Sequence, residues 1–302
     1  MAQKRRKYRK QRSLKALLFR LIIGIICILT AGTGAWSYSL SGKLLPTREL
    51  LTGDASIHFI DVGQGDATLI MTGTNSVLID TGTNASADSL VTYLETYVGQ
   101  IDYLILTHPH DDHTGGADEV LDAIPVRNVI TPDIPGNDYY RVLEELSDTY
   151  DFNLIPAEPG NRYEAGEIYC TILGPVHLDH SNLNDVSIVT KVDIGSVSLL
   201  CSGDAEQIAE QDVLANTDPA LLDCDIYQVG HHGSSTSTSM EFFYAISPDI
   251  CVISCGNGNS YGHPHSTVVS LIELSGSDLY RTDLEGTIVL DIKEETTVRR
   301  IW

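Results

Sequence analysis

Residues 104–116 read Leu-Ile-Leu-Thr-His-Pro-His-Asp-Asp-His-Thr-Gly-Gly, and this stretch decides the fold. An apolar run ends there, and His108, His110, Asp112 and His113 follow at once. Imidazole nitrogens and carboxylate oxygens are the ligands that zinc and similar divalent ions favour. The alternating spacing lets His108 and His110 face one side and Asp112 and His113 another, so one loop can serve two metals. A plain polar loop after a strand is the alternative, but it does not explain so dense a ligand set.

Outward from this stretch, the chain alternates between strand-like and helix-like segments, which indicates an α/β (α+β) fold. Sets of strands with a helix between them recur in both halves, so we expect packed sheets with helices outside. The turn-rich segment Pro156–Gly166 is expected to be a surface loop. The expected strands are Ala55–Ile60, Ala67–Thr72, Ser76–Asp80, Tyr103–Leu106, Asn128–Ile130, Tyr169–Leu173, Ser187–Ile194, Val197–Cys201, Ile226–Val229, Ile250–Ser254 and Gly286–Ile292. The expected helices are Ala85–Tyr97, Gly116–Ile124, Asp138–Tyr150, Ala205–Asn216, Ser239–Ile246 and Thr267–Leu274.

Further polar clusters follow expected strands, where the ends of a sheet can gather them at one site. Asp80 is a candidate for holding a ligand histidine by a hydrogen bond, or else an acidic turn residue. Asp204 is a candidate to bridge two metals, or else a helix N-cap. The pair His231-His232 reads as one ligand and one substrate contact, and His263 as a loop histidine suited to holding an anion.

Asp61 and Asp66 flank the tight turn of Asp-Val-Gly-Gln-Gly-Asp. We expect both aspartates to be structural, with lining of the site as the alternative.

The N-terminal segment differs from the rest of the chain. Residues 1–16 form a basic head, residues 17–36 are apolar except for Arg20, and residues 37–52 read as a linker to a domain over residues 53–302. Twenty apolar residues at about 1.5 Å per residue span roughly the 30 Å hydrocarbon core. The positive-inside bias predicts a cytoplasmic head, a single-pass membrane anchor and a domain outside the cell. A cleaved signal peptide with a secreted domain, and a domain that faces the cytoplasm, are the alternatives.

Charge and cysteine content restrict the function classes. Ten of the 19 basic residues lie in the first 44 positions. The remainder of the chain therefore contains 9 basic and all 41 acidic residues and has a net charge of about −32. So acidic a domain repels nucleic-acid backbones, which disfavours a nucleic-acid partner. Of the six cysteines, five lie in the domain and cannot all pair, which argues against a disulfide scaffold, and Cys201 and Cys251 are expected to be buried.

The order of the motifs is more specific than any one of them. The chain reads Asp-Val-Gly-Gln-Gly-Asp, Ile-Asp-Thr-Gly, Thr-His-Pro-His-Asp-Asp-His, Asn-x-x-Ser, Ser-Gly-Asp, Gly-His-His-Gly-Ser and Tyr-Gly-His-Pro. From about Ser56 to Ile292 this resembles the metallo-beta-lactamase superfamily, and most of all the branch with the C-terminal domain of the competence DNA-uptake protein ComEC. The resemblance implies a four-layer αββα sandwich with a two-metal site at the strand ends.

Carried onto this chain, the resemblance implies two divalent metal ions, Zn²⁺ or alternatively Mn²⁺. One would be held by His108 and His110, and the other by Asp112, His113 and one of His231 and His232, of which His232 is favoured. Asp204 would bridge the two metals, and Asp80 would hydrogen-bond a ligand histidine. Many relatives place a third histidine on the first metal. Here that interval holds only His177 and His180, with Asn184-Asp-Val-Ser187 nearby, so the first site is expected to be poor in ligands.

The chemistry that fits is metal-assisted hydrolysis, with Asp112 orienting a proton and His231 and His263 contacting the substrate. The expected function is a phosphodiesterase or nuclease that acts on a small or polymeric phosphoester outside the membrane. Hydrolysis of another ester, of phosphocholine or wall-polymer type, and a non-catalytic metal-binding surface module are the alternatives.

Overall fold

The structure is a computed structural model, and it describes residues 55–293 and 296–301. The predicted basic head, membrane segment and linker over residues 1–52 lie outside the described residues. Within the described part of the chain, no helix is both long and apolar enough to cross a bilayer.

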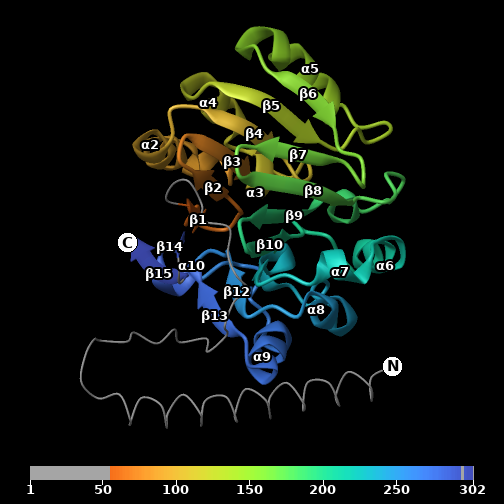
Figure 1. The fold of residues 1–302 in the computed structure, drawn as a ribbon. Coiled ribbons are helices and arrows are strands. Elements are labelled where there is room, and N and C mark those ends of the chain that lie inside the picture. The colour runs from red at the N-terminus through yellow and green to blue at the C-terminus, as the bar shows by residue number, and fades with distance from the viewer. Residues whose placement is uncertain (1–54, 294–295, 302) are drawn as a thin grey trace, which may run out of the picture. The chain divides into compact units, whose positions relative to one another are not determined.

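Two large sheets form the framework (Figure 1). In spatial order, sheet A consists of β15 (Thr297–Ile301), β14 (Thr287–Ile292), β1 (Ala55–Phe59), β2 (Thr68–Thr72), β3 (Asn75–Ile79), β4 (Ile101–Ile105), β5 (Val126–Thr131) and β6 (Asn153–Pro156). Sheet B consists of β13 (Asp278–Arg281), β12 (Ile250–Ile253), β11 (Ile226–Gln228), β10 (Val197–Cys201), β9 (Val189–Ile194), β8 (Ile168–Gly174) and β7 (Arg162–Ala165).

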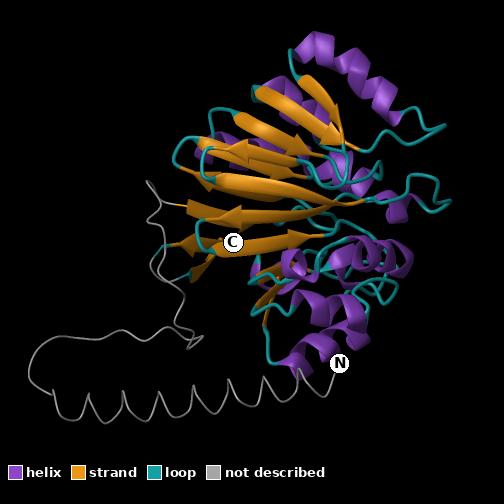
Figure 2. Ribbon diagram, turned by 45° about the vertical axis from the view of Figure 1, so that its right-hand side comes forward, coloured by secondary structure: helices purple, strands orange, loops and turns teal. Residues whose placement is uncertain are grey.

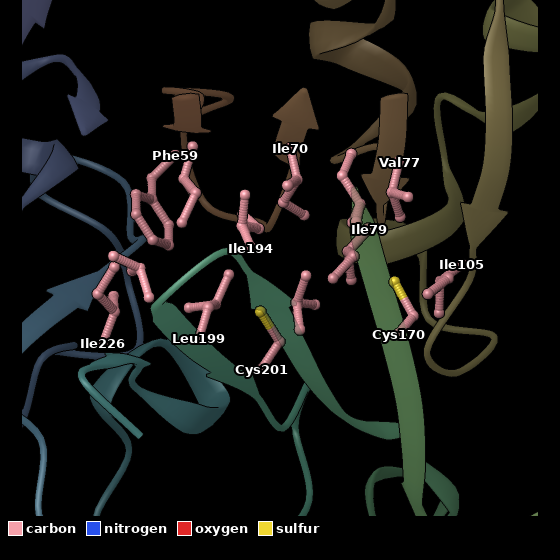
Figure 3. Close-up of a cluster of buried hydrophobic side chains, with 14 of the residues drawn as sticks. Phe59, Ile70, Val77, Ile79, Ile105, Cys170, Ile194, Leu199, Cys201 and Ile226 are labelled. Atoms are coloured by element: carbon pink, nitrogen blue, oxygen red, sulfur yellow. The ribbon is translucent and has the colours of Figure 1, made fainter. Parts of the chain in front are cut away.

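The sheets pack face to face through apolar side chains that alternate along their strands. Figure 3 shows Phe59, Ile70 and Val77 of sheet A opposite Leu199 and Ile226 of sheet B. All five side chains are fully buried or nearly so. This inter-sheet layer is the largest of the three buried apolar clusters, and apolar burial contributes about 25 cal/mol per Å² to its stability.

Helices cover the outer face of each sheet, and Figure 2 shows them in purple around the orange strands. Sheet A is covered by α2 (Ala87–Tyr97), α4 (Ala117–Ala123) and α5 (Tyr139–Tyr150). Sheet B is covered by α6 (Gln207–Asn216), α7 (Pro219–Leu222), α8 (Met240–Ile246) and α9 (Ser266–Ser275). The domain therefore has the α+β arrangement of two sheets between helices that the sequence predicts.

Each sheet is antiparallel in one part and parallel in the other, and this arrangement positions the site. Strands β3 to β6 run parallel in sheet A, and β10 to β13 run parallel in sheet B. Parallel neighbours end at the same edge, so the loops after β3, β4, β10, β11 and β12 are brought together. Short elements occupy these connections: η1 (Asn84–Ser86), α3 (Asp111–Thr114), η2 (Leu183–Val186), η3 (Gly230–Gly233) and α10 (Thr282–Glu285).

The prediction that Pro156–Gly166 is a surface loop is wrong in part. Strand β6 ends at Pro156, and β7 lies inside the segment, where it forms a hairpin with β8. Both are edge strands with mostly exposed or half-buried side chains, so they lack the apolar alternation that marks an inner strand. Edge position likewise explains β13 and β15, which the sequence did not predict. The five cysteines in the described residues are buried and unpaired, which confirms the expected burial of Cys201 and Cys251.

Candidate metal centre

The predicted ligands come from three connections, after β4, β10 and β11, and meet at the parallel ends of the two sheets. His108 and His110 follow β4, while Asp112 and His113 lie in α3, one helical turn where a loop was expected. From sheet B, Asp204 follows β10, and His232 lies in η3 after β11.

Two groups of possible ligand atoms share Asp204. Asp112, His113, Asp204 and His232 each offer an atom within 4.8 Å of the others, and so do His108, His110 and Asp204. Asp204 Oδ1 lies 3.1 Å from His113 Nε2, and its Oδ2 lies 3.9 Å from His108 Nε2. The structure thus brings together the six residues that the sequence suggests as ligands, with one carboxylate between two clusters.

Metal ions fit this arrangement because three buried atoms that face one another make no hydrogen bond to any described residue. They are His113 Nε2, Asp204 Oδ1 and His232 Nε2. Leaving such groups unpaired in the interior costs roughly 1–3 kcal/mol each. A divalent cation between them would satisfy all three, and the nitrogen and carboxylate donors suit zinc or manganese.

Two of the four candidate ligand rings, His113 and His232, are fixed by a hydrogen bond on the side away from Asp204. His113 Nδ1 donates to Asp80 Oδ2 at 2.7 Å, and His232 Nδ1 donates to the carbonyl oxygen of Ser254 at 3.0 Å. Asp80 also accepts from the backbone N–H and the hydroxyl of Thr107, both at 2.8 Å. With Nδ1 as the donor, each neutral ring presents the Nε2 lone pair to the site, as a metal ligand must.

The electrostatics of the cluster favour positive charge. Burial alone would lower the pKa of His113 and His232, but nearby carboxylates, Asp204 above all, raise both pKa values well above the ordinary value. Burial would raise the pKa of Asp204, yet His113 and His232 hold it well below its usual range. The same balance lowers the pKa of Asp112 to about 2, against its own burial. A site that attracts protons this strongly also attracts a divalent cation, and metal binding then releases the protons.

Asp66 lies closer to the site than expected. Its Oδ1 is 3.5 Å from His232 Nδ1, and it is buried beside Asp80 and His113. A Cβ atom at Gly65 would lie 2.4 Å from the carbonyl oxygen of Asp112, and the Asp66 N–H donates to that oxygen at 3.0 Å. Glycine therefore lets this turn pack against α3. Asp61, in contrast, is exposed, and its Oδ1 accepts a hydrogen bond from Gly63 N–H in its own turn.

A cavity of about 380 Å³ opens over the cluster. His231 and His263 line it, as the sequence suggests for substrate contacts. The His231 Nε2 atom is 3.5 Å from Asp204 Oδ2, and Tyr261 stacks on His263 with ring centroids 5.6 Å apart. Burial and the neighbouring imidazoles lower the pKa of His263 to about 4, so it is neutral at pH 7. The lining is Gln64, His110, Asp111, Asp112, Asn184, Asp204, His231, His232, Tyr261 and His263.

His177 and His180, which lie between His113 and Asp204 in the sequence, do not line the cavity. His180 pairs with Asp212 of α6 at 3.1 Å, and His177 stacks edge-on against His180. Gln64 and Tyr261 line the cavity without having been singled out by the sequence. Only their nearness to the Gly-Gln-Gly and Tyr-Gly-His-Pro motifs pointed to them.

Comparisons with known proteins agree with this geometry. The sequence profile of the metallo-beta-lactamase superfamily matches residues 60–256. ComE operon protein 3 of Bacillus subtilis (strain 168) is 30% identical over 259 residues, which cover 79% of this chain and 33% of that protein. Competence protein ComA of Neisseria gonorrhoeae is 29% identical over 281 residues, covering 91% and 38%. The chain thus spans about a third of the length of these curated relatives.

Among solved structures, the fold resembles that of the metallo-beta-lactamase fold protein YhfI from Bacillus subtilis. The TM-score is 0.57 at 13% identity, over 79% of this chain and all of YhfI.

Proposed function

The chain belongs to the metallo-beta-lactamase superfamily, and from that premise we propose that it is a two-metal phosphodiesterase. The observation that carries the proposal is the convergence of unpaired buried ligand atoms under a cavity lined by imidazole and amide groups. Its sequence similarity to the ComE operon and competence proteins supports a phosphoester substrate over a β-lactam.

In this proposal, His108 and His110 hold one metal, Asp112, His113 and His232 hold the other, and Asp204 bridges them. Two bound divalent cations would lower the pKa of a water molecule and stabilise negative charge on the attacked centre. The protein's own contribution is to hold the ligands rigidly, through the hydrogen bonds behind His113 and His232.

The side chains around the cluster have distinct tasks. Asp112 is ionised at neutral pH, and its Oδ2 lies 3.3 Å from His232 Nε2 at the floor of the cavity. It can accept a hydrogen bond from the attacking water and orient it. His231 and the neutral His263 can each donate an N–H to a non-bridging phosphate oxygen. The bond between His231 Nδ1 and the Thr236 hydroxyl, at 3.1 Å, restrains that ring.

Surface charge favours a small phosphodiester over a long polyanion. At least six basic side chains in the described residues form ion pairs: Arg127, Arg141, Lys191, Arg281, Arg299 and Arg300. Arg162 lies 4.2 Å from the centre of the Tyr169 ring. The cavity lining, within the described residues, contains no lysine or arginine. A long nucleic-acid strand would therefore find few cations with which to pair.

For location, we propose that residues 17–36 anchor the protein in the cell membrane with the hydrolase domain outside. The support is the basic head followed by an apolar stretch of spanning length. Secretion after cleavage of this segment is the alternative.

The test is hydrolysis by the purified full chain, loaded with Zn²⁺ or Mn²⁺, of bis-p-nitrophenyl phosphate, DNA and a phosphocholine ester. We expect turnover of the small diester, and a loss of about 10²-fold or more in His263→Gln and His231→Gln together. Asp61→Asn, an exposed aspartate outside the cavity, is the matched control. Turnover of the phosphocholine ester alone would favour the other-ester hydrolase, and metal binding without any turnover would favour a non-catalytic module.

A further inference from the structure

The two metal sites differ in what the protein offers them. The Asp112 cluster supplies two carboxylates and two imidazoles, whereas the His108 cluster supplies two imidazoles and a share of Asp204. A cation at the His108 cluster would therefore have fewer ligands and less negative charge around it. Among the described residues, no other histidine, cysteine, aspartate or glutamate has an atom within 4.8 Å of all three ligand atoms of the His108 cluster. An amide oxygen could act as a further donor to this cluster.

Asn184 has the properties of that donor. Its side chain is 9% exposed, and it lines the same cavity as His110, Asp204 and His231. Its Oδ1 atom is buried and accepts no hydrogen bond from any residue that the structure describes. A buried amide oxygen without a partner costs roughly 1–3 kcal/mol, so a native structure needs a reason for it.

The orientation of this amide is fixed by its other end. Asn184 Nδ2 donates to Glu206 Oε1 at 3.1 Å. The reverse orientation would place two oxygens against each other, so Oδ1 must face away from Glu206. The same Glu206 oxygen is 3.5 Å from His231 Nδ1, and His231 Nε2 is 3.5 Å from Asp204 Oδ2. Asn184 is thus linked to the bridging carboxylate through two side chains, Glu206 and His231.

The backbone around Asn184 is also tied to the bridging residue. Asp185 Oδ1 accepts from Glu206 N–H at 3.2 Å, and Ser187 Oγ accepts from Asp204 N–H at 3.2 Å. The Asn184 N–H donates to Asn182 Oδ1 at 3.2 Å, which caps η2. These bonds hold η2 and the Asp204 connection as one unit, as a ligand-bearing segment requires.

We infer that Asn184 Oδ1 is a ligand of the first metal and completes the site formed by His108, His110 and Asp204. A neutral amide oxygen is a harder and weaker donor than an imidazole. This site therefore discriminates less strongly against Mn²⁺ than an all-histidine site would, and it releases Zn²⁺ more readily. The second metal, with two carboxylates, is held more tightly. The inference rests on the two-metal assignment, but it is tested by metal content and not by hydrolysis.

The experiment uses the purified full chain, stripped with a chelator and titrated with Mn²⁺ and, separately, with Zn²⁺. Bound metal is counted by elemental analysis, and coupled Mn²⁺ pairs are detected by electron paramagnetic resonance. Wild type is expected to bind two equivalents with unequal affinity. Asn184→Ala should keep the tight equivalent, weaken the other by at least about tenfold, and lose the coupled-pair signal. Asn184→Asp, which keeps an oxygen donor, should retain both.

Asn184→His separates a ligand role from a folding role. It should tighten Zn²⁺ at the weaker site, which a merely structural asparagine would not allow. Asn216→Ala, at the exposed end of α6, is the matched control and should behave as wild type. Two full equivalents with unchanged affinities in Asn184→Ala, or no gain in Zn²⁺ affinity in Asn184→His, would overturn the inference. A wild-type protein that binds only one metal would instead overturn the two-metal assignment.

Discussion

Replacing Asp80 with asparagine changes one atom of a group that touches no substrate, yet we expect it to weaken metal binding. The carboxylate accepts three hydrogen bonds, two from Thr107 and one from His113 Nδ1. In Asp80→Asn, Oδ1 still accepts from the Thr107 N–H, but the new NH₂ faces His113 Nδ1. To pair with it, His113 must move its proton to Nε2, the atom that lies 3.1 Å from Asp204 and would bind metal.

The cost follows from that choice of tautomer. Either His113 Nε2 loses the lone pair that would bind metal, or the hydrogen bond to residue 80 is lost. Changing the hydrogen-bond partner of a metal-binding histidine weakens metal affinity by about 10–100-fold, or roughly 1.4–2.7 kcal/mol. Chelator competition on the full chain measures this affinity. Asp102→Asn is the matched control, because Asp102 is equally buried and accepts hydrogen bonds from Asn75, Ser76 and Arg127 away from the cavity. Unchanged affinity in Asp80→Asn, or an equal loss in Asp102→Asn, would refute the reasoning.

Three further outcomes are expected. Because most basic side chains of the domain are engaged in ion pairs, the enzyme should cleave a short diester, and any DNA cleavage should depend only weakly on salt, as for about two phosphate contacts or fewer. Efficient DNA cleavage that falls steeply with salt, without turnover of the diester, would contradict this. Protease added to intact cells should digest the domain if residues 17–36 anchor it outward, and protection until lysis would refute the orientation. Burial, with the nearby Arg299, lowers the pKa of His58 from 6.5 to about 4. Between these two pH values, His58 is protonated in the unfolded chain and neutral in the folded one. Stability from this group is complete above pH 6.5 and is lost as the pH falls to 4, by up to about 3 kcal/mol, and urea unfolding of His58→Gln should show a flatter profile over that window.

The sequence predicts which residues meet at the site because most of them closely follow an apolar strand. His108, Asp204 and His232 lie within a few residues of the ends of β4, β10 and β11, and parallel strands bring such positions together. The strand runs themselves are recognisable because their side chains are buried on both faces, between the other sheet and the outer helices.

The residues that the sequence placed less well are those positioned by packing between distant segments. Asp66 reaches the site because its turn lies against α3, a contact that no local pattern encodes. Asn184 and His180 are four residues apart, yet one lines the cavity and the other pairs with Asp212 on α6. The sequence predicted only that the first site is poor in ligands, because nothing local distinguishes these two positions.

The assignment of two metals around one bridging carboxylate is tested most directly by counting metal in wild type and in Asp204→Ala. The full chain is loaded with Zn²⁺ or Mn²⁺, freed of excess metal, and analysed for bound equivalents. We expect about two per wild-type chain, and in Asp204→Ala a loss at both positions, since the shared carboxylate neutralises the repulsion between two adjacent cations. Full metal content in Asp204→Ala, with a fold shown to be intact by its melting temperature, would contradict the two-metal centre.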